Sequence, residues 1–276
     1  MLSRVCRTSR KRIGIMGGSG PDAGVDLMKK ILRTNRAFLG PGVGDKDAPF
    51  ITLMNVPTIG GPHGSWDLQK GTKEYKELID GMKQAAKNIA ICTDYFCIAC
   101  NTLHKYLHVC MLILAYTDLY SCWRVERVQP EVEKYLGEEK IPARFISIVD
   151  TVSLYCKENN VKDLVVLGSK LTTDVHGDSP YAPLSSIVKL VELPGEVRDM
   201  QQQALELIKT KGPENKQVQD LFQTIVDSFD GENVLLGCTE FPLMKPKTSK
   251  KLIDPTQLLA DRLVHLSWGL SEDAEE

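Results

Sequence analysis

The sequence lacks any apolar run near the ~18 residues that a membrane-spanning helix requires, so no membrane partner is expected. It also lacks a strong charge of one sign: the formal net charge is −2, which argues against nucleic-acid binding. The eight cysteines are not clustered as in a small secreted scaffold, and 276 residues suffice for a hydrophobic core. We therefore expect free thiols in a reducing compartment, in one large domain or two modest ones.

Residues 1–12 contain no Asp or Glu but five Arg or Lys residues, together with Ser and Thr. This composition is typical of an organelle transit peptide and also of a short basic tail. Because the first strand pattern begins at Ile13, we interpret residues 1–12 as a basic tail and the protein as cytoplasmic, with organelle import as the alternative. Residues 271–276 are interpreted as an acidic tail.

Strand and helix patterns alternate along the rest of the chain, which predicts an α/β fold with mostly parallel sheets flanked by helices. The plan occurs twice, so we expect two similar domains, residues 13–142 with 254–270 and residues 143–253. The expected strands are 13–16, 50–54, 94–99, 144–149, 163–167, 232–237 and 252–254, with another within 181–193. The expected helices are 22–32, 73–90, 151–158, 196–210, 215–229 and 255–268.

Two of the predicted strands are followed by the same pattern of residues. The first ends at Ala99 and is followed by Cys100, Asn101 and Thr102; 138 residues after Cys100, Cys238 and Thr239 follow the other strand. The carboxyl ends of parallel strands face the crevice in which such sheets bind ligands. Two thiols in equivalent places are therefore the main candidates for a functional site.

A glycine turn at residues 17–21 joins the first strand to the first helix, and its backbone N–H groups are suited to binding an anion. Gly18, Gly20 and Ala23 also match the dinucleotide fingerprint. We do not favour NAD binding, because Pro21 intrudes and the next strand ends at Asn55, where a ribose-binding acid is needed.

Cys92, Cys97 and Cys100 have the spacing of plant-type iron–sulfur ligands. They are predicted to lie at a helix end, inside a strand and at its tip, whereas cluster ligands need one wrapping loop. We therefore predict neither a cluster nor structural zinc, and we interpret Cys97 as a core thiol.

Residues 108–128 interrupt the alternation with an apolar and aromatic segment that has no helical stripe. We interpret them as an insertion in the first domain that lies outside its core; the segment also resembles translated non-coding sequence. Residues 57–65, rich in Gly and Pro, form a loop after another strand end, and His63 in this loop is a possible site residue.

Several motifs together resemble the aspartate/glutamate racemase family. They are residues 14–23, 100–104 (Cys-Asn-Thr-Leu-His), 147–151, 237–240 (Gly-Cys-Thr-Glu) and 253–255, and the resemblance extends from residue 13 to about 268. The paired cysteine motifs are specific, whereas the glycine turn alone is not. The resemblance implies two similar α/β domains with the active site in the cleft between them, no cofactor and no metal. It also implies that Cys100 and Cys238 are the catalytic residues and that the ligand is a small amino-acid substrate. We further expect the protein to form a homodimer.

Inverting an α-carbon requires removing a proton from one face and delivering a proton to the other, so one group must enter as thiolate and the other as thiol. A thiol suits this task, since its pKa of ~8.5 lies near neutrality and falls at a helix N-terminus, where we expect both cysteines. The residues expected to hold the α-carboxylate and the developing charge are Gly18, Ser19, Asn101, Thr102 and Thr239, with Lys170 adding a positive charge. Possible further site residues are His104, which orients a thiol or caps a helix, and Glu240.

One feature departs from the family. Aspartate-preferring members usually carry an arginine shortly after the motif Asn-x-Pro, and none follows Asn55, Val56 and Pro57 here. The distal carboxylate of the substrate must then rely on Lys170, His63 or backbone donors. We expect aspartate as the substrate, with glutamate as the second candidate and looser specificity than in an arginine-bearing relative.

Two other functions remain open at this point. One is a related racemase or decarboxylase that acts on another substrate, such as a hydantoin. The other is a non-catalytic protein of the same fold that binds an acidic ligand. A decarboxylase needs one proton donor and a binding protein needs none, so the presence of both cysteines favours racemisation.

Overall fold

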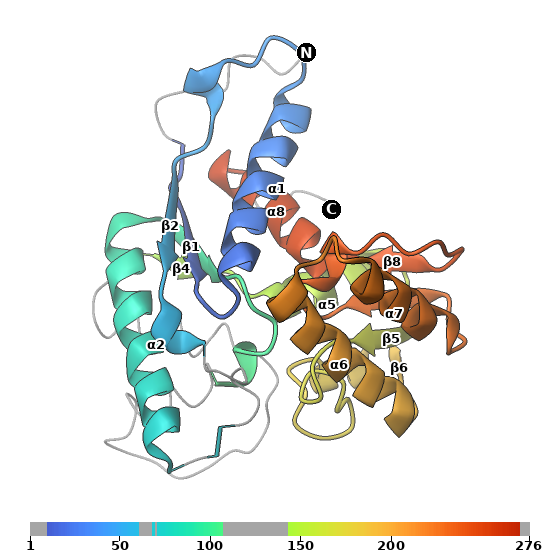
Figure 1. Cartoon of the computed structure of the whole chain (residues 1–276). Coiled ribbons are helices and arrows are strands. Elements are labelled where there is room, and N and C mark those ends of the chain that lie inside the picture. The colour runs from blue at the N-terminus through green and yellow to red at the C-terminus, as the bar shows by residue number, and fades with distance from the viewer. Residues whose placement is uncertain (1–9, 61–67, 70, 107–142, 271–276) are drawn as a thin grey trace.

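The computed structural model describes residues 10–60, 68–69, 71–106 and 143–270. Most of the basic tail, His63, the expected insertion at 108–128 and the acidic tail lie outside the described residues. The described chain forms two α/β domains side by side, as Figure 1 shows. Among the described helices, none is both long and apolar enough to cross a membrane.

The first domain is a parallel sheet with strand order β2-β1-β3-β4. Its helices α1 and α2 flank the strands (Figure 1). The elements are β1 (Ile13–Gly17), α1 (Pro21–Leu39), β2 (Ile51–Asn55), α2 (Lys73–Cys92), β3 (Tyr95–Ile98) and β4 (Arg144–Phe145).

The second domain repeats this arrangement, with a parallel sheet of order β6-β5-β7-β8. Its elements are α5 (Ile148–Glu158), β5 (Asp163–Leu167), β6 (Lys189–Val191), α6 (Gly195–Lys211), α7 (Lys216–Asp227), β7 (Asn233–Leu236) and β8 (Lys251–Ile253). The terminal helix α8 (Pro255–Ser267) leaves this sheet and packs against both α1 and α5. The two-domain α/β fold predicted from the sequence is therefore confirmed.

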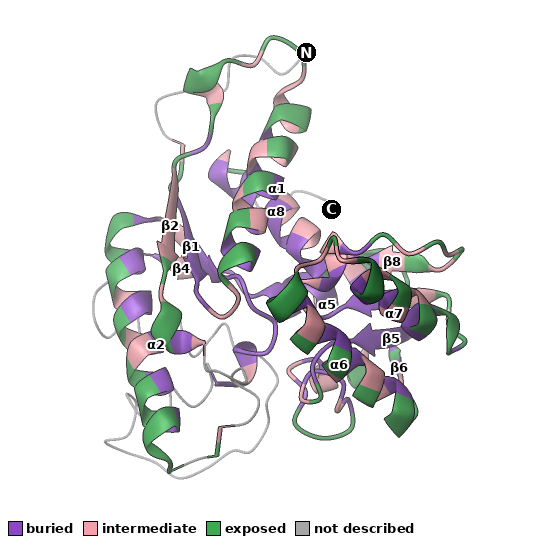
Figure 2. Ribbon diagram, viewed as in Figure 1, coloured by how far each residue is buried: buried purple, intermediate pink, exposed green. Residues whose placement is uncertain are grey.

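Burial explains why the strands are short apolar runs. All five residues of β1 are buried, and four of the five residues of β5 are buried, because helices cover both faces of each sheet. Figure 2 shows the buried residues concentrated in the strands and on the inner sides of the helices. In α1, Ala23, Leu27 and Ile31 recur every four residues and form the buried stripe.

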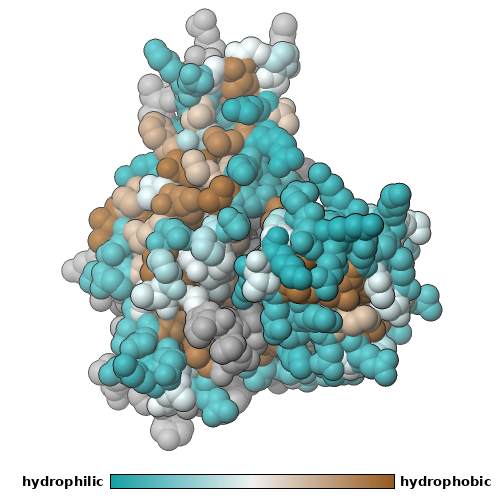
Figure 3. All heavy atoms as spheres, viewed as in Figure 1, coloured by the Kyte–Doolittle hydropathy of each residue, from teal (hydrophilic) through white to brown (hydrophobic). Residues whose placement is uncertain are grey.

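The edge strand β2 is the exception, since none of its residues is fully buried. Phe50, directly before it, is 61% exposed. In the surface view of Figure 3, hydrophobic atoms gather on the first domain, whereas the surface over α6 and α7 is mostly hydrophilic. The homodimer expected from the sequence stays a prediction.

The largest difference between a predicted and an observed helix boundary arises from tertiary contacts. Helix α1 continues to Leu39 rather than ending at residue 32. Buried Asn35 accepts a hydrogen bond from Trp268 Nε1 at 2.9 Å and donates one to Asp47 O at 2.9 Å, which holds the extra turns in place. Those partners lie far along the chain, so the local pattern does not reveal them.

The expected strand 144–149 is largely replaced by a helix. Only Arg144 and Phe145 pair, and they pair with β3 of the first sheet, so that sheet extends past residue 142, where the sequence placed its end. Ser147 then acts as the N-cap of α5, since its Oγ accepts a hydrogen bond from Asp150 N–H at 3.2 Å. The apolar residues after the cap belong to the buried face of a helix rather than to a strand.

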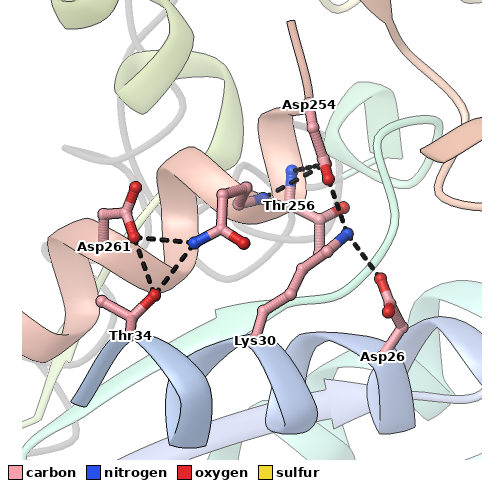
Figure 4. A network of polar contacts seen from close by, with 7 residues as sticks. Asp26, Lys30, Thr34, Asp254, Thr256 and Asp261 are labelled. Atoms are coloured by element: carbon pink, nitrogen blue, oxygen red, sulfur yellow. Dashed lines mark hydrogen bonds and ion pairs between the residues drawn. The ribbon is translucent and has the colours of Figure 1, made fainter. Parts of the chain in front are cut away.

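A buried ion-pair network lies where α8 leaves the second sheet (Figure 4). The Lys30 ammonium of α1 contacts Asp26 Oδ2 at 2.6 Å and Asp254 Oδ2 at 2.7 Å, and only 8% of the lysine side chain is exposed. The other carboxylate oxygen of Asp254 accepts the N–H groups of Thr256 and Gln257 and so caps α8. One cation therefore ties a helix of the first domain to the link between the two domains.

We expect Lys30→Met to destabilise the protein by about 3–5 kcal/mol, because two carboxylates would lose their buried cation. Urea unfolding monitored by circular dichroism would measure the loss. Lys73→Met is the matched control, since the Lys73–Glu77 pair is exposed (side chains 84% and 60%) and its loss should be barely measurable. Equal stabilities of the two variants would contradict the structural role of Lys30.

Candidate active site

The two cysteine-bearing strand ends meet in one cavity between the domains. The cavity has a volume of about 20 Å³, enough for roughly one water molecule. It is lined by Ser19, Cys100, Asn101, Thr102, Leu205, Lys209, Cys238, Thr239 and Glu240. Residues from both domains thus enclose a space that contains both candidate thiols.

The sheet topology explains why the two thiols converge. Cys100 lies shortly after β3 and Cys238 shortly after β7, and these strands occupy the same third place in the two sheet orders. In both sheets the strands are parallel, so the residues that follow β3 and β7 lie at the carboxyl edges of their sheets. The two thiols, which the sequence placed after equivalent strands, therefore occupy equivalent positions in the two domains.

Cys100 is buried, and its Sγ donates a weak hydrogen bond to Ser19 Oγ at 3.6 Å. Burial raises the pKa of this thiol. The negative charge of Glu240 also raises it, whereas the Ser19 hydroxyl and the backbone N–H groups of Leu103 and Thr102 lower it. The surroundings of Cys100 therefore contain groups that favour its thiolate.

Cys238 has a different partner, a carboxylate. Its Sγ donates to Glu240 Oε2 at 2.9 Å, and Thr239 Oγ1 donates to the same oxygen at 3.0 Å. Burial raises the pKa of Cys238 well above its ordinary value, and the negative charge of Glu240 and its hydrogen bond raise it further. Glu240 therefore favours the protonated thiol at this position.

These directions correct the expectation that helix N-termini lower both thiol pKa values. Cys238 precedes only the short 3-10 helix Phe241–Leu243, which is too short to act as a helix dipole of useful strength. Burial in the closed cavity is the largest cause of the shift at both thiols. Burial outweighs the local N–H groups because the charged thiolate loses its hydration.

The glycine turn lies against the cavity and against an outer crevice of about 590 Å³. Ser19, Lys209 and Glu240 line both spaces and form the wall between them. Gly18 lines only the outer crevice; it has a φ of 129°, and a Cβ there would meet Val56 O at 2.1 Å. The close passage of this turn over Val56 thus requires glycine.

Hydroxyl groups from both domains meet beside the cavity. Thr102 Oγ1 lies 3.3 Å from both Ser169 Oγ and Thr172 Oγ1, which lie 2.9 Å from each other. All three side chains are buried. Thr102, which follows β3, is thus held by the turn that follows β5, so closure of the domains fixes its orientation.

Two candidates from the sequence lie away from the cavity. Lys170 is not among the lining residues: its side chain is 60% exposed and its ammonium pairs with Asp199 Oδ1 at 2.9 Å. Lys170 follows buried Ser169, so its side chain emerges on the outer side of the turn. His63 lies outside the described residues.

His104 is fully buried beneath the cavity wall. Its Nδ1 lies 2.8 Å from Cys100 O, and its Nε2 accepts the N–H of Ile148 at 3.4 Å. Burial lowers its pKa to about 4, so the ring is neutral near pH 7. Of the two expected roles, the geometry fits capping of a helix, because Ile148 is the first residue of α5.

The remaining cysteines are separated as the sequence suggested. Cys92 is exposed at the end of α2, while Cys97 is buried in β3 and burial strongly raises its pKa. Within the described part of the chain, no group of three or more His, Cys, Asp or Glu side chains is arranged to hold a metal ion.

Three residues near the thiols were missed by the sequence analysis. Lys209 and Leu205 lie four residues apart on α6, so both reach the cavity from one helix face. The third is Tyr181, which donates a hydrogen bond to Asn101 Oδ1. The helical periodicity of the sequence shows which face of α6 is buried. Only the packing of the two domains shows that Leu205 and Lys209 reach the cavity.

Comparison with known proteins supports the fold and goes no further. No protein-family model matches the sequence. The two-domain arrangement is that of solved aspartate and glutamate racemase structures. An aspartate racemase from Picrophilus torridus superposes with a TM-score of 0.66 at 19% identity, over 93% of this chain and 94% of the other.

Two further structures give the same result. An aspartate racemase homologue from Pyrococcus horikoshii OT3 has a TM-score of 0.60 at 20% identity, over 93% of this chain and 99% of the other. A glutamate racemase from Francisella tularensis in complex with D-glutamate has a TM-score of 0.55 at 17% identity, over 97% and 85%. At these identities the similarity is one of fold.

We expect Glu240→Gln to accelerate alkylation of Cys238 by iodoacetamide about tenfold near pH ~8. Removing the carboxylate charge lowers the pKa of the thiol and so raises its thiolate fraction. The rate would be measured by mass spectrometry of the Cys238 peptide, in a Cys100→Ser background. Glu232→Gln, at an exposed position before the amino end of β7, is the matched control. An unchanged or slower rate in Glu240→Gln would contradict the assignment.

Proposed function

We propose that this protein racemises an acidic amino acid, with aspartate as the preferred substrate and glutamate as the second candidate. The observation that supports this most directly is that Cys100 and Cys238, from equivalent strand ends of two similar domains, line one cavity. Inversion of an α-carbon requires two proton carriers, one for each face of that carbon.

In the proposed reaction, Cys100 enters as thiolate and Cys238 as thiol. Ser19 and backbone N–H groups favour the anion at Cys100. The charge of Glu240 raises the pKa of both thiols, but only Cys238 also donates a hydrogen bond to it, so the proton is held more firmly at Cys238. The Cys100 thiolate takes the α-proton from one face, and Cys238 delivers its proton to the other face. The turnover ends with Cys100 as thiol and Cys238 as thiolate, so protons are conserved.

The α-carboxylate needs donors, since negative charge spreads onto it as the α-proton leaves. Asn101, Thr102 and Ser19 line the cavity and offer amide or hydroxyl donors. Thr239 also lines it, with its hydroxyl proton donated to Glu240 Oε2. Gly18 contributes through the turn that carries Ser19 rather than by lining the cavity. We propose that these residues bind the α-carboxylate of the substrate.

The distal carboxylate of the substrate requires a cation, and Lys209 takes the place we had given to Lys170. Lys209 lines both the cavity and the outer crevice, whereas Lys170 lines neither. A lysine at the cavity wall supports a dicarboxylic substrate even without the arginine that aspartate-preferring members usually carry.

Access requires the domains to separate, because the cavity has room for about one water molecule. The outer crevice reaches the wall formed by Ser19, Lys209 and Glu240, so this wall is the proposed entrance. Closing the site around the substrate would exclude water from the exchanging protons.

The alternatives receive less support from the geometry. A decarboxylase needs one thiol as proton donor, and a binding protein needs neither. A hydantoin racemase remains compatible with the thiol pair, but a neutral ring would make no use of Lys209.

We expect Cys100→Ser and Cys238→Ser each to abolish racemisation of both enantiomers of aspartate, because each turnover needs one thiol to remove a proton and the other to deliver one. Exchange followed in deuterated water, with no added cofactor, would measure this. Each variant should still eliminate a β-leaving group from one enantiomer, and the two should choose opposite enantiomers.

The matched control is Cys92→Ser, since Cys92 is exposed and distant from the cavity lining. It should racemise at the parent rate, as should Cys97 and Cys156 variants that remain folded. Near-parent racemisation by Cys238→Ser would exclude a two-base reaction. Elimination from the same enantiomer by both single variants would mean that the thiols do not flank the α-carbon.

Lys209→Met should reduce the preference for aspartate over asparagine, measured as the ratio of kcat/KM values, by about tenfold or more. The side chain keeps much of its length and loses the charge that contacts the distal carboxylate. Lys170→Met is the control and should leave the ratio unchanged, because its partner is Asp199. If Lys170→Met lowers the ratio and Lys209→Met does not, then Lys170 rather than Lys209 binds the distal carboxylate.

A further inference from the structure

Tyr181 is a buried residue of the second domain whose hydroxyl points at the candidate active site. It precedes the short 3-10 helix Ala182–Ser186, and its side chain is 0% exposed. The hydroxyl donates to Asn101 Oδ1 of the first domain. Because a carboxamide oxygen only accepts hydrogen bonds, the tyrosine must be the donor.

The other end of the same carboxamide has no such partner. Asn101 Nδ2 is buried, and it forms no hydrogen bond with the described part of the chain. Asn101 is 1% exposed and lines the cavity that contains Cys100 and Cys238. Buried amide groups almost always have partners, so two N–H donors at the edge of this cavity call for an acceptor from a ligand.

We propose that Tyr181 is a positioning residue: it holds Asn101 Oδ1 so that the Asn101 amide nitrogen faces the α-carboxylate of the substrate. This inference rests on the proposed racemase function. Turning the carboxamide over would place its oxygen against the anionic substrate and would take away the acceptor that the buried Tyr181 hydroxyl proton uses. Tyr181 therefore selects the one orientation in which Asn101 attracts a carboxylate.

The hydrogen bond also connects this orientation to domain closure. Asn101 follows β3 of the first sheet, and Tyr181 belongs to the segment between β5 and β6 of the second. The neighbouring contacts of Thr102 with Ser169 and Thr172 cross the same boundary. The amide is thus aimed at the substrate only when the domains have closed around it.

The first test is Tyr181→Phe, which removes the hydroxyl and keeps the ring. We expect kcat/KM for aspartate to fall about tenfold, mostly in kcat, because the charge on the carboxylate grows as the α-proton leaves. Tyr155→Phe is the matched control, since that hydroxyl bonds to Lys251 away from the cavity. Parent kinetics in Tyr181→Phe would overturn the proposal.

A double-mutant cycle separates positioning from packing. If Tyr181 acts through Asn101, then adding Tyr181→Phe to an Asn101→Ala variant should cause no further loss of kcat/KM. An equal loss in both backgrounds would mean that the tyrosine acts only on the packing of the domains, and the proposal would be wrong.

The third test does not depend on turnover. In ¹⁵N-labelled protein, the side-chain amide resonance of Asn101 should shift when succinate is added, and the shift should be much smaller in Tyr181→Phe. Asn101→Asp, which keeps the acceptor for Tyr181 but replaces the amide nitrogen by oxygen, should bind succinate about tenfold more weakly. If the parent resonance does not move, the proposal fails. If it moves and depends on Tyr181 while no amino acid is racemised, the positioning role stands and the proposed function fails.

Discussion

The burial of Cys100 and the partial burial of Cys238 in one small cavity is the constraint on which the rest of the site depends. A cavity of about 20 Å³ surrounds Cys100 and Cys238, and burial is the first cause of the raised pKa at each. In such surroundings a charge is costly unless a hydrogen-bond donor lies beside it. Every polar side chain in the wall therefore affects which thiol carries the proton, and hydrogen bonds there act more strongly than they would in water.

The enclosure exists only because the two domains meet, and the contacts between them are largely polar near the site. Tyr181 with Asn101, and Ser169 and Thr172 with Thr102, join the domains next to the thiols. Further away, Lys30 binds Asp254 where the chain returns to the first domain (Figure 4). Polar contacts separate at less cost than an apolar interface would, since water replaces the lost hydrogen bonds. This composition suits a cleft that has to open for a substrate and close around it.

The sequence predicted the fold and the convergence of the thiols because both follow from local patterns. Each of the two motifs, Cys-Asn-Thr and Gly-Cys-Thr-Glu, follows an apolar strand. The order of the strands in each sheet then fixes where the motif lies in the fold. What the sequence missed depends on tertiary contacts. Lys209 is an exposed helix residue by pattern, and only the placement of α6 over the cleft brings it to the cavity. The direction of the thiol pKa shifts was wrong for the same reason, since burial is set by the partner domain. Similarly, β4 is only two residues long, too short for a pattern.

The unequal surroundings of the two thiols have a consequence for the proposed reaction. Enantiomers have equal free energies in water, so kcat/KM must be the same in both directions whatever the enzyme does. Cys100 has Ser19 beside it, whereas Cys238 has Glu240. This difference can change kcat and KM between the two enantiomers, but it must change both by the same factor so that kcat/KM stays equal. After one turnover the thiolate lies at Cys238, next to the Glu240 carboxylate, which is the less favourable of the two protonation states. Return of the proton to Cys238 is therefore favoured, and the resting enzyme is prepared for the enantiomer whose α-proton faces Cys100.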